Sequence, residues 1–469
     1  MHNKLAHSIY DRSPVWAQDL LLSAYGLQLK RTRYGGNYQQ QLDQLMQERT
    51  HDELRELQAQ ELARLLVHAQ RHVPWYRRLF ADHGIQASQI DLENFSRLVP
   101  ILEKNQLHAH AQQLVADNLA SRQLHTINTS GTTGSPLNVV TTVTALQKNY
   151  AFFERFLRSA SVSSNDPSVT FAGRMLLPAR QSGPPYWRRN LAANTLLCSS
   201  YHIAPATAAD YLRRIADFKP TYIDAYPSAA FTLAQHLLAQ PEHHDINLRA
   251  IVTSSETLFD HQRALIEQAF GCRVFDQYGN AEMAACITQC EHGLYHVNME
   301  YGIVEVLRED GTAAAAGESG ELVCTGFLNH AMPMIRYRIG DSAIVADTAC
   351  GCGRPWPTLS ALLGRADDQI LATDGRQIGR LDPLFKGLDG IKETQLVQTA
   401  PNQIIVNLVR TADYTASTGD KLVEALKARV GHDMHVELHF LEHIPRTAAG
   451  KFRAVISQLD AGQTAPSEQ

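Results

Sequence analysis

The feature that most restricts the fold is an alternation of β-rich and helical segments between residues 160 and 290. The segments TYIDAYPS and LRAIVTSSE are rich in strand-forming side chains, and helical segments such as SAAFTLAQHLLAQ and FDHQRALIEQAF follow them. Strands separated by helices pair in parallel, because the helix returns the chain across the sheet. The alternation therefore predicts an α/β fold with a parallel sheet covered by helices.

The segments after this region have a different pattern. Residues 301–346 contain YGIVEVLREDGT and GELVCTGF, two strand-like segments joined by a polar turn, which predicts a β-rich subdomain over about 290–360. Strand and helix signals resume after a segment rich in Asp and Gly that begins near residue 366. A chain of 469 residues exceeds what one hydrophobic core usually supports. We expect a multidomain α+β arrangement, with a large N-terminal domain over 1–365 and a small, mobile C-terminal domain over 366–469.

Composition restricts the partners of the protein. With 44% hydrophobic residues, 19% charged residues and a formal net charge of -5, the chain has no general attraction for nucleic acid or anionic membranes. No apolar run approaches the ~18 residues that span a bilayer, and the first residues lack the apolar core of a signal peptide. We expect a cytoplasmic protein that acts on a small molecule, without membrane insertion. A homodimer is compatible with these features.

A glycine-rich segment, TSGTTGSP at residues 129–136, is typical of a phosphate-binding turn. Gly131 and Gly134 permit a tight turn, and the serines and threonines add hydroxyl groups to the free backbone N–H groups. A Walker loop instead carries a lysine between a strand and a helix, whereas this segment has no lysine and is followed by the β-branched LNVVTTVT. A Walker-type phosphotransferase is therefore disfavoured. Taken alone, the segment is equally typical of a polar surface turn.

Five motifs in a fixed order decide between these interpretations. They are TSGTTGSP, DQYGNAE at 276–282, YRIGD at 337–341, GRADD at 364–368 and PRTAAGKFR at 445–453. Together they span most of the chain and resemble the adenylate-forming superfamily of acyl-CoA synthetases, nonribosomal peptide adenylation domains and luciferases. Within it, they resemble the phenylacetate–CoA ligase-like branch. The segments SPVWAQDLLLSAYGLQLKRTRYGGNY, AYPS, DGRQIGRLD and IKETQLVQ further resemble CapK-like proteins of polysaccharide loci.

The resemblance implies that the glycine-rich loop holds the β- and γ-phosphates of ATP. The loop residues are Thr129, Ser130, Gly131, Thr132, Thr133, Gly134 and Ser135. Positive charge would come from Mg²⁺, held by an oxygen of Glu282, and from Lys451, which would enter the site for adenylation. Lys451 and Glu282 are thus the expected catalytic residues. Asp367 matches the hinge about which the C-terminal domain rotates between two half-reactions.

The resemblance also implies where the rest of the nucleotide lies. Tyr278, followed by Gly279, offers a flat face on which adenine can stack. Asp341 can accept hydrogen bonds from both ribose hydroxyls, and Arg365 would contact the phosphate or ribose. Glu256, in SSETL, matches the segment on the adenine side. These residues form the predicted nucleotide site.

Four further residues have the pattern of metal ligands. Cys290 and His296 occur in CEHGLYH, whereas Cys350 and Cys352 occur in CGCGR at the other end of the β-rich segment. Three thiolates and an imidazole are a normal tetrahedral set for structural Zn²⁺, and His292 is an alternative to His296. Free thiols in turns are the simpler interpretation. Related phenylacetate–CoA ligase-like proteins resemble this chain in these cysteines, so we expect a zinc site.

Together, these features predict an enzyme that uses Mg-ATP to activate a carboxylic acid as an acyl-adenylate, releasing pyrophosphate. Transfer to coenzyme A is the expected second step. Transfer to an amine, giving an amide in polysaccharide or cell-envelope biosynthesis, is the alternative, and a catalytically silent nucleotide-binding protein is a third hypothesis. The acid pocket is expected within residues 171–228, where Arg174, Arg188 or Arg189 could pair with an anionic acid or belong to a solvated basic loop.

Overall fold

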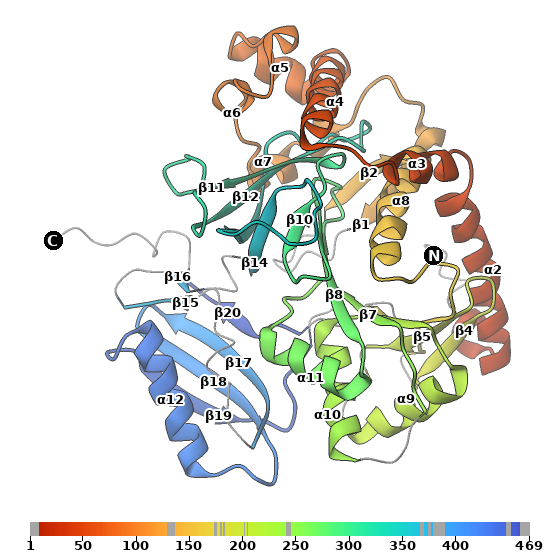
Figure 1. Cartoon of the computed structure of the whole chain (residues 1–469), viewed down its shortest axis with the longest axis vertical. Helices are drawn as coiled ribbons and strands as arrows, with labels where there is room; N and C mark the ends of the chain where they lie inside the picture. Colours follow the sequence, from red (N-terminus) through yellow and green to blue (C-terminus); the bar gives the residue numbers. More distant parts are fainter. Residues whose placement is uncertain are drawn as a thin grey trace.

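A computed structural model gives the arrangement of most of the chain. It describes residues 9–128, 137–172, 176–178, 181, 183–200, 202–203, 205–240, 245–365, 370–373, 377–378, 390–446 and 452–459. Figure 1 shows a large body and, coloured blue, a smaller one formed by the C-terminal strands and helix. Within these ranges, no helix has the length and apolar character needed to cross a membrane.

The large body is organised by one mixed sheet of twelve strands, in the order β11-β12-β13-β14-β10-β9-β8-β7-β6-β3-β5-β4. Strands β3, β5, β6, β7 and β8 pair in parallel, and the edge strand β4 pairs antiparallel with β5. Their bounds are β3 Ser168–Ala172, β4 Trp187–Asn190, β5 Thr195–Ser199, β6 Tyr222–Ala225, β7 Ala250–Ser254 and β8 Arg273–Gly279. The predicted α/β fold with a parallel sheet is confirmed.

The β-rich segment continues this same sheet, because β9 pairs with the end of β8. Its strands all pair antiparallel. They are β9 Cys286–Gln289, β10 Tyr295–Val297, β11 Gly302–Leu307, β12 Ser319–Gly326, β13 Tyr337–Val345 and β14 Thr358–Arg365. The DQYGNAE and YRIGD motifs therefore belong to strands of one sheet, although about sixty residues separate them in the sequence.

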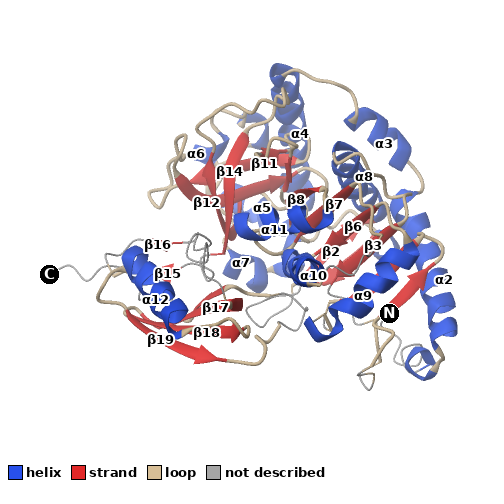
Figure 2. Cartoon of the chain, turned by 60° about the horizontal axis from the view of Figure 1, so that its bottom comes forward, coloured by secondary structure: helices blue, strands red, loops and turns tan. Residues whose placement is uncertain are grey.

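Different helices cover the two faces of the parallel strands, as Figure 2 shows. On one face, Val169, Phe171 and Ile251 pack against α9, α10 and α11. On the other face, Phe156 and Leu157 of α8 pack against the sheet, and α2 lies beside α8. The bounds are α2 Val15–Tyr34, α8 Val143–Ser159, α9 Pro205–Phe218, α10 Pro227–Ala239 and α11 Asp260–Phe270. Strand side chains alternate between the faces, so each strand contributes to both layers.

The N-terminal part forms a helical layer over the β-rich end of the sheet and shares its hydrophobic core. Its elements are α3 Tyr38–Leu45, α4 His51–His72, α5 Pro74–Asp82, α6 Phe95–Leu98, α7 Lys104–Ala109, and 3₁₀ turns at Ala87–Gln89, Ala111–Leu114 and Ser121–Gln123. Helix α4 begins with a capping box in which Thr50 and Glu53 bond each other's backbone N–H groups. A hairpin of β1 (Leu124–Asn128) and β2 (Asn138–Thr142) then leads into α8.

The smaller body has a four-stranded sheet in the order β19-β18-β17-β20. Leu422, Leu426 and Val430 of its helix pack against Ile404 and Val406 of the sheet. The elements are β15 Ile370–Leu371, β16 Gln377–Ile378, β17 Ile391–Ala400, β18 Gln403–Arg410, α12 Ala416–Val430, β19 His435–Phe440 and β20 Val455–Ser457. This α+β body has its own core and agrees with the predicted fold class.

Candidate active site and metal cluster

Tyr278 and Asp341, from two motifs far apart in the sequence, meet in the structure. Tyr278 lies near the end of β8 and Asp341 lies within β13, and the Tyr278 hydroxyl donates to Oδ2 of Asp341 at 2.6 Å. Burial, together with the charge of Asp341, raises the pKa of Tyr278 well above its usual value, so its hydroxyl remains a donor. Asp341 also pairs in register with Arg365 of β14. The structure thus brings three predicted nucleotide residues together.

Glu282 lies in the turn that follows β8 and is partly buried. Its charge adds to the effects that raise the pKa of Tyr278, which places the carboxylate in the electrostatic environment of the Tyr278 hydroxyl. A carboxylate at this position can offer an oxygen to a hard cation. Its contact with Mg²⁺ remains a prediction.

Glu256 joins the two bodies of the molecule. It follows β7, and its Oε2 accepts a hydrogen bond from the Ser228 backbone N–H at 3.0 Å. Its Oε1 accepts from the backbone N–H of Phe452 at 2.6 Å. The Arg446 guanidinium lies over the Phe452 ring, 4.5 Å from its centre. Burial raises the pKa of the Glu256 carboxyl. Glu256 therefore binds the C-terminal motif directly, a contact that the sequence did not predict, whereas its role toward adenine remains a prediction.

Several predicted residues lie outside the described part of the chain. They are the loop residues 129–135, Asp367 and Lys451. The elements that flank the loop are described, and the β-branched segment after it forms strand β2, which pairs with β1 before it. Asn128 and Asn138 are opposite each other in the β1–β2 hairpin, on either side of the loop. Thr142 ends this hairpin and caps α8, because its hydroxyl accepts from the Ala145 N–H at 3.2 Å.

A cavity of about 540 Å³ lies between the sheet and the helices α2 and α8. It reaches from Gly279 and Asn280, in the DQYGNAE motif, to Lys30 and Arg33 near the end of α2. Its size is within the usual range for small-molecule sites. The cavity therefore begins beside the predicted nucleotide residues and extends away from them along one face of the sheet.

The basic side chains at this cavity differ from those that the sequence suggested. Arg188 is 1% exposed, and its guanidinium donates to side chains of Gln18 and Gln181 and to backbone carbonyls. The hydrogen bond from Arg188 to Gln18 therefore connects β4 to α2. Arg189 is exposed and lies over the Phe218 ring, and neither arginine lines the cavity. Arg174 lies outside the described residues. Lys30 and Arg33 had no motif to identify them, although both occur in the segment shared with CapK-like proteins.

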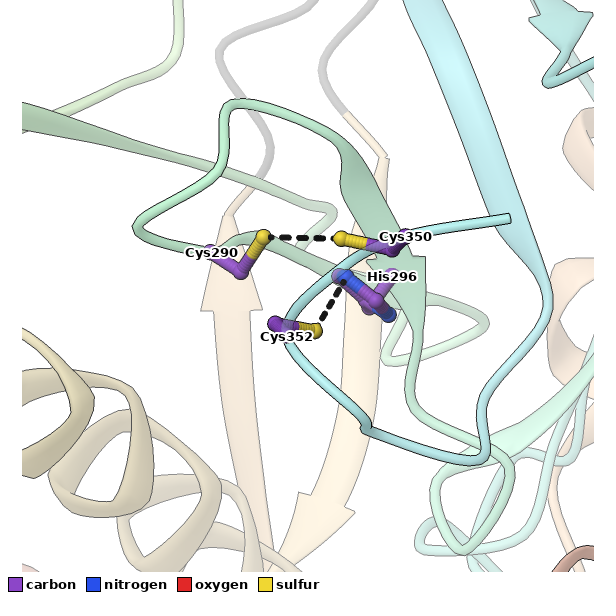
Figure 3. A group of neighbouring side chains, drawn as sticks. All are labelled: Cys290, His296, Cys350 and Cys352. Carbon is purple, nitrogen blue, oxygen red and sulfur yellow. Dashed lines mark hydrogen bonds between the residues drawn. The ribbon is translucent and has the colours of Figure 1, made fainter. Parts of the chain in front are cut away.

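The four predicted metal ligands converge, as Figure 3 shows. Cys290 lies in the β9–β10 connection, His296 lies in β10, and the other two cysteines lie in the connection from β13 to β14. Their ligand atoms all lie within 4.8 Å of one another. The Sγ atoms of Cys290 and Cys350 are 3.4 Å apart, as are Sγ of Cys352 and Nε2 of His296. Tetrahedral Zn²⁺ with bonds of about 2.3 Å to sulfur needs ligand separations of about 3.8 Å, so the set fits this ion.

The protonation state of His296 also suits a metal. Burial disfavours the charged imidazole and lowers the pKa of His296 to about 4, so its ring is neutral near pH 7. All four residues belong to the cluster, whereas His292 does not and lines a neighbouring cavity instead. Of the two histidines that the sequence offered as the fourth ligand, His296 is therefore the one that lies in the cluster.

Known proteins resemble this chain in both sequence and fold. The family model of the CapK C-terminal domain matches residues 370–458. The chain is 26% identical to Protein CapK of Staphylococcus aureus over 456 residues, which cover 96% of this chain and 99% of that protein. It is 28% identical to the phenylacetate-coenzyme A ligase of Thermus thermophilus over 349 residues, covering 71% and 74% of the two chains.

A solved 2-hydroxyisobutyryl-CoA ligase has the same fold. In its postadenylation state, it matches with a TM-score of 0.66 at 22% identity, covering 86% of this chain and 88% of that chain. In its thioesterification state, the TM-score is 0.52 at 21% identity, with coverage of 85% and 88%.

The fold and these similarities support an adenylate-forming, AMP-forming ligase. The chain is similar to proteins of the adenylate-forming superfamily, and within it to the phenylacetate–CoA ligase-like branch. Within that branch, it is CapK-like, since the similarity to Protein CapK extends over nearly the full length of both chains.

Proposed function

We propose that this ligase activates a carboxylic acid with Mg-ATP, releases pyrophosphate and transfers the acyl group from the adenylate to coenzyme A. The convergence of three motifs carries the proposal. The Tyr278–Asp341 hydrogen bond joins two of them, and the Glu256–Phe452 hydrogen bond brings the third to the same end of the sheet. Attack of a carboxylate on the α-phosphorus requires alignment and charge neutralisation rather than a protein nucleophile.

Each nucleotide residue has one task in this proposal. Asp341 accepts hydrogen bonds from the ribose, and Tyr278 orients that carboxylate while presenting its ring to adenine. Arg365 contacts the phosphate or ribose. Glu282 gives an oxygen to Mg²⁺, and the ion would neutralise phosphate charge when bound. The glycine-rich loop at residues 129–135 surrounds the β- and γ-phosphates.

Lys451 acts on the phosphates only while the C-terminal domain is docked for adenylation. Phe452, the next residue, donates its backbone N–H to Glu256, which supports a docked arrangement. Rotation about Asp367 would then replace this arrangement with the one used for acyl transfer.

The proposed reaction is tested by the exchange of radioactive pyrophosphate into ATP in the presence of a panel of acids. Acid-dependent exchange shows the first half-reaction. Adding coenzyme A, or a panel of amines, then separates thioester from amide formation. If no acid supports exchange although ATP binds, the proposed function is wrong and the silent nucleotide-binding hypothesis is favoured.

We also propose that Cys290, His296, Cys350 and Cys352 hold a structural Zn²⁺. The support is the approach of all four ligand atoms to within 4.8 Å of one another, in a set of three thiols and an imidazole that suits tetrahedral Zn²⁺. Zinc would join the β9–β10 connection to the connection between β13 and β14. These are the strands that flank the predicted nucleotide residues, so the ion would stabilise the site without taking part in the chemistry.

A further inference from the structure

The floor of the cavity beneath α2 and α8 is polar, which is unusual for a sheet covered by helices on both faces. Its side chains come from five neighbouring strands. The polar ones are Ser168 and Thr170 of β3, Thr195 of β5, Asp224 of β6, Ser254 of β7 and Gln277 of β8, and Leu197 of β5 and Tyr222 of β6 lie among them. The opposite face of the same strands is apolar and carries Val169, Phe171, Ile223, Ile251 and Val274. The polar floor is therefore confined to the cavity.

Some of the polar groups of the floor are hydrogen-bonded within the protein. Buried polar groups cost free energy unless they have hydrogen-bond partners, and the protein supplies some of these partners itself. Ser168 and Thr195 share a hydrogen bond of 3.1 Å, and the Ser254 hydroxyl approaches that of Ser255 at 3.4 Å. Ser255 has a φ of 71°, a left-handed conformation that is uncommon for residues other than glycine and asparagine. Such conformations concentrate at ligand sites.

Asn280 supplies a second and independent observation. Its Oδ1 accepts from the backbone N–H of Ala284 at 2.8 Å, which fixes the orientation of the amide. Its Nδ2 is buried, and within the described part of the chain no acceptor bonds it. Asn280 lines the cavity at the end nearest Tyr278 and Asp341. An unpaired buried donor at this end suits an oxygen atom of a ligand.

The two ends of the cavity indicate how an acid would lie. Its carboxylate must approach the α-phosphate of ATP, so it belongs at the end that carries Gly279 and Asn280. The rest of the acid then extends over the polar floor toward α2. There, Tyr150 and Phe153 of α8 add aromatic faces, and Lys30 and Arg33 give the entrance a positive potential that attracts an anion.

We propose that the cavity is the acid site and that it selects a carboxylic acid bearing several hydroxyl groups, of about the size of a sugar acid. The hydroxyls of the acid bond the polar floor, its less polar face lies on the aromatic rings, and Nδ2 of Asn280 donates to the carboxylate. An apolar acid such as phenylacetate would offer no polar groups to the floor. This inference rests on the proposed function, because it names the acid for the same adenylation site.

Pairs of acids with matched skeletons test the selection by pyrophosphate exchange. D-glucuronate is compared with cyclohexanecarboxylate, and D-gluconate with hexanoate, with phenylacetate as a further apolar probe. A site built to bond hydroxyls rejects an analogue without them by factors near 10⁴, so we expect the hydroxylated member to have a kcat/KM at least about 100-fold higher. Equal or greater exchange with the apolar members would overturn the inference but leave the proposed function intact. Absence of exchange with every acid would instead refute both.

Two substitutions locate the recognition within the cavity. Thr170→Val removes one hydroxyl from the floor at nearly constant volume and should reduce the preference for D-glucuronate over cyclohexanecarboxylate by about 10-fold. Thr32→Val is the matched control, because Thr32 is on α2 but does not line the cavity. An unchanged preference in Thr170→Val would overturn the role of the floor.

Asn280→Ala should lower kcat/KM for both members of a pair by a similar factor of about 10, because the carboxylate is common to them. The KM for ATP should not change. Asn280→Asp keeps the acceptor for Ala284 but lacks the donor, so it should share this loss. If only Asn280→Ala is impaired, Asn280 acts through the Ala284 turn and does not touch the acid.

Discussion

Glu256 should control the first half-reaction without touching the reacting atoms. Its Oε1 accepts the Phe452 N–H at 2.6 Å, and its Oε2 accepts the Ser228 N–H at 3.0 Å. A hydrogen bond to a charged group contributes about 1.5 to 3 kcal/mol. Losing the Phe452 bond would therefore reduce the equilibrium constant for docking of the C-terminal domain by about 10- to 150-fold.

The assay separates the two half-reactions. In Glu256→Ala, pyrophosphate exchange should fall by about 10- to 150-fold, whereas formation of thioester from a supplied acyl-adenylate and coenzyme A should change little. Glu256→Gln keeps one neutral acceptor but turns an NH₂ group toward one of the two backbone donors, so its loss should be intermediate. The acyl-transfer reaction uses the other domain arrangement, in which this contact is not required.

A matched control distinguishes docking from general destabilisation. Glu267 of α11 also accepts a backbone hydrogen bond, from Val274 N–H at 2.9 Å, but both partners belong to the large body. Glu267→Ala should lower the melting temperature without a selective loss of exchange. The docking argument is refuted if Glu256→Ala impairs both half-reactions equally, or if it leaves exchange unchanged.

Three further outcomes are expected. Lys451→Ala should abolish acid-dependent pyrophosphate exchange but leave acyl transfer from a supplied adenylate much less affected, and an equal loss of both would indicate misfolding. Zinc analysis of untagged protein should give about one ion per chain. Cys350→Ser should lose the zinc and also lose thermal stability, whereas the control Cys272→Ser should keep both. A stable wild-type protein without metal would contradict the zinc site. Asp276 is 4% exposed, and burial raises its pKa from 3.8 to about 6, so its contribution to stability is present below pH 3.8 and is lost as pH rises through 6. Relative to wild type, Asp276→Asn should therefore gain up to about 3 kcal/mol between pH 4 and pH 7, as measured by urea unfolding, and a constant difference would show that Asp276 does not titrate in this range.

The sequence predicted those parts of the fold and site that have local signals. Alternating segments predicted the parallel sheet, and motifs identified Tyr278 and Asp341, which meet in the structure. Ligand spacing identified Cys290 with a nearby histidine, and Cys350 with Cys352, and these two pairs also meet. The sequence could not choose between His292 and His296. That choice depends on whether the turn before β10 or β10 itself directs its histidine toward Cys350 and Cys352.

Residues whose roles arise from distant packing were missed. Arg188 has a cationic side chain of the kind that binds anionic ligands. Its partner Gln18, however, is 170 positions away on α2, so no local sequence pattern shows that Arg188 has a structural role. Lys30 and Arg33 reach the cavity only because α2 lies across the sheet beside β4. The Glu256–Phe452 contact joins residues 196 positions apart and depends on how two separate bodies dock. Periodicity carries no information on such contacts.

The side-chain alternation of β8 connects the two halves of the proposed active site. Asp276 accepts hydrogen bonds from Thr253 and Tyr295, at 2.6 and 2.8 Å, on the face opposite the acid cavity. Tyr278, two residues later, points to that same face and bonds Asp341. Gln277 and Gly279 face the cavity instead. Strand β8 thus presents Tyr278 on one face and Gln277 and Gly279 to the proposed acid cavity on the other, so a shift of β8 by one residue would disrupt both sites together.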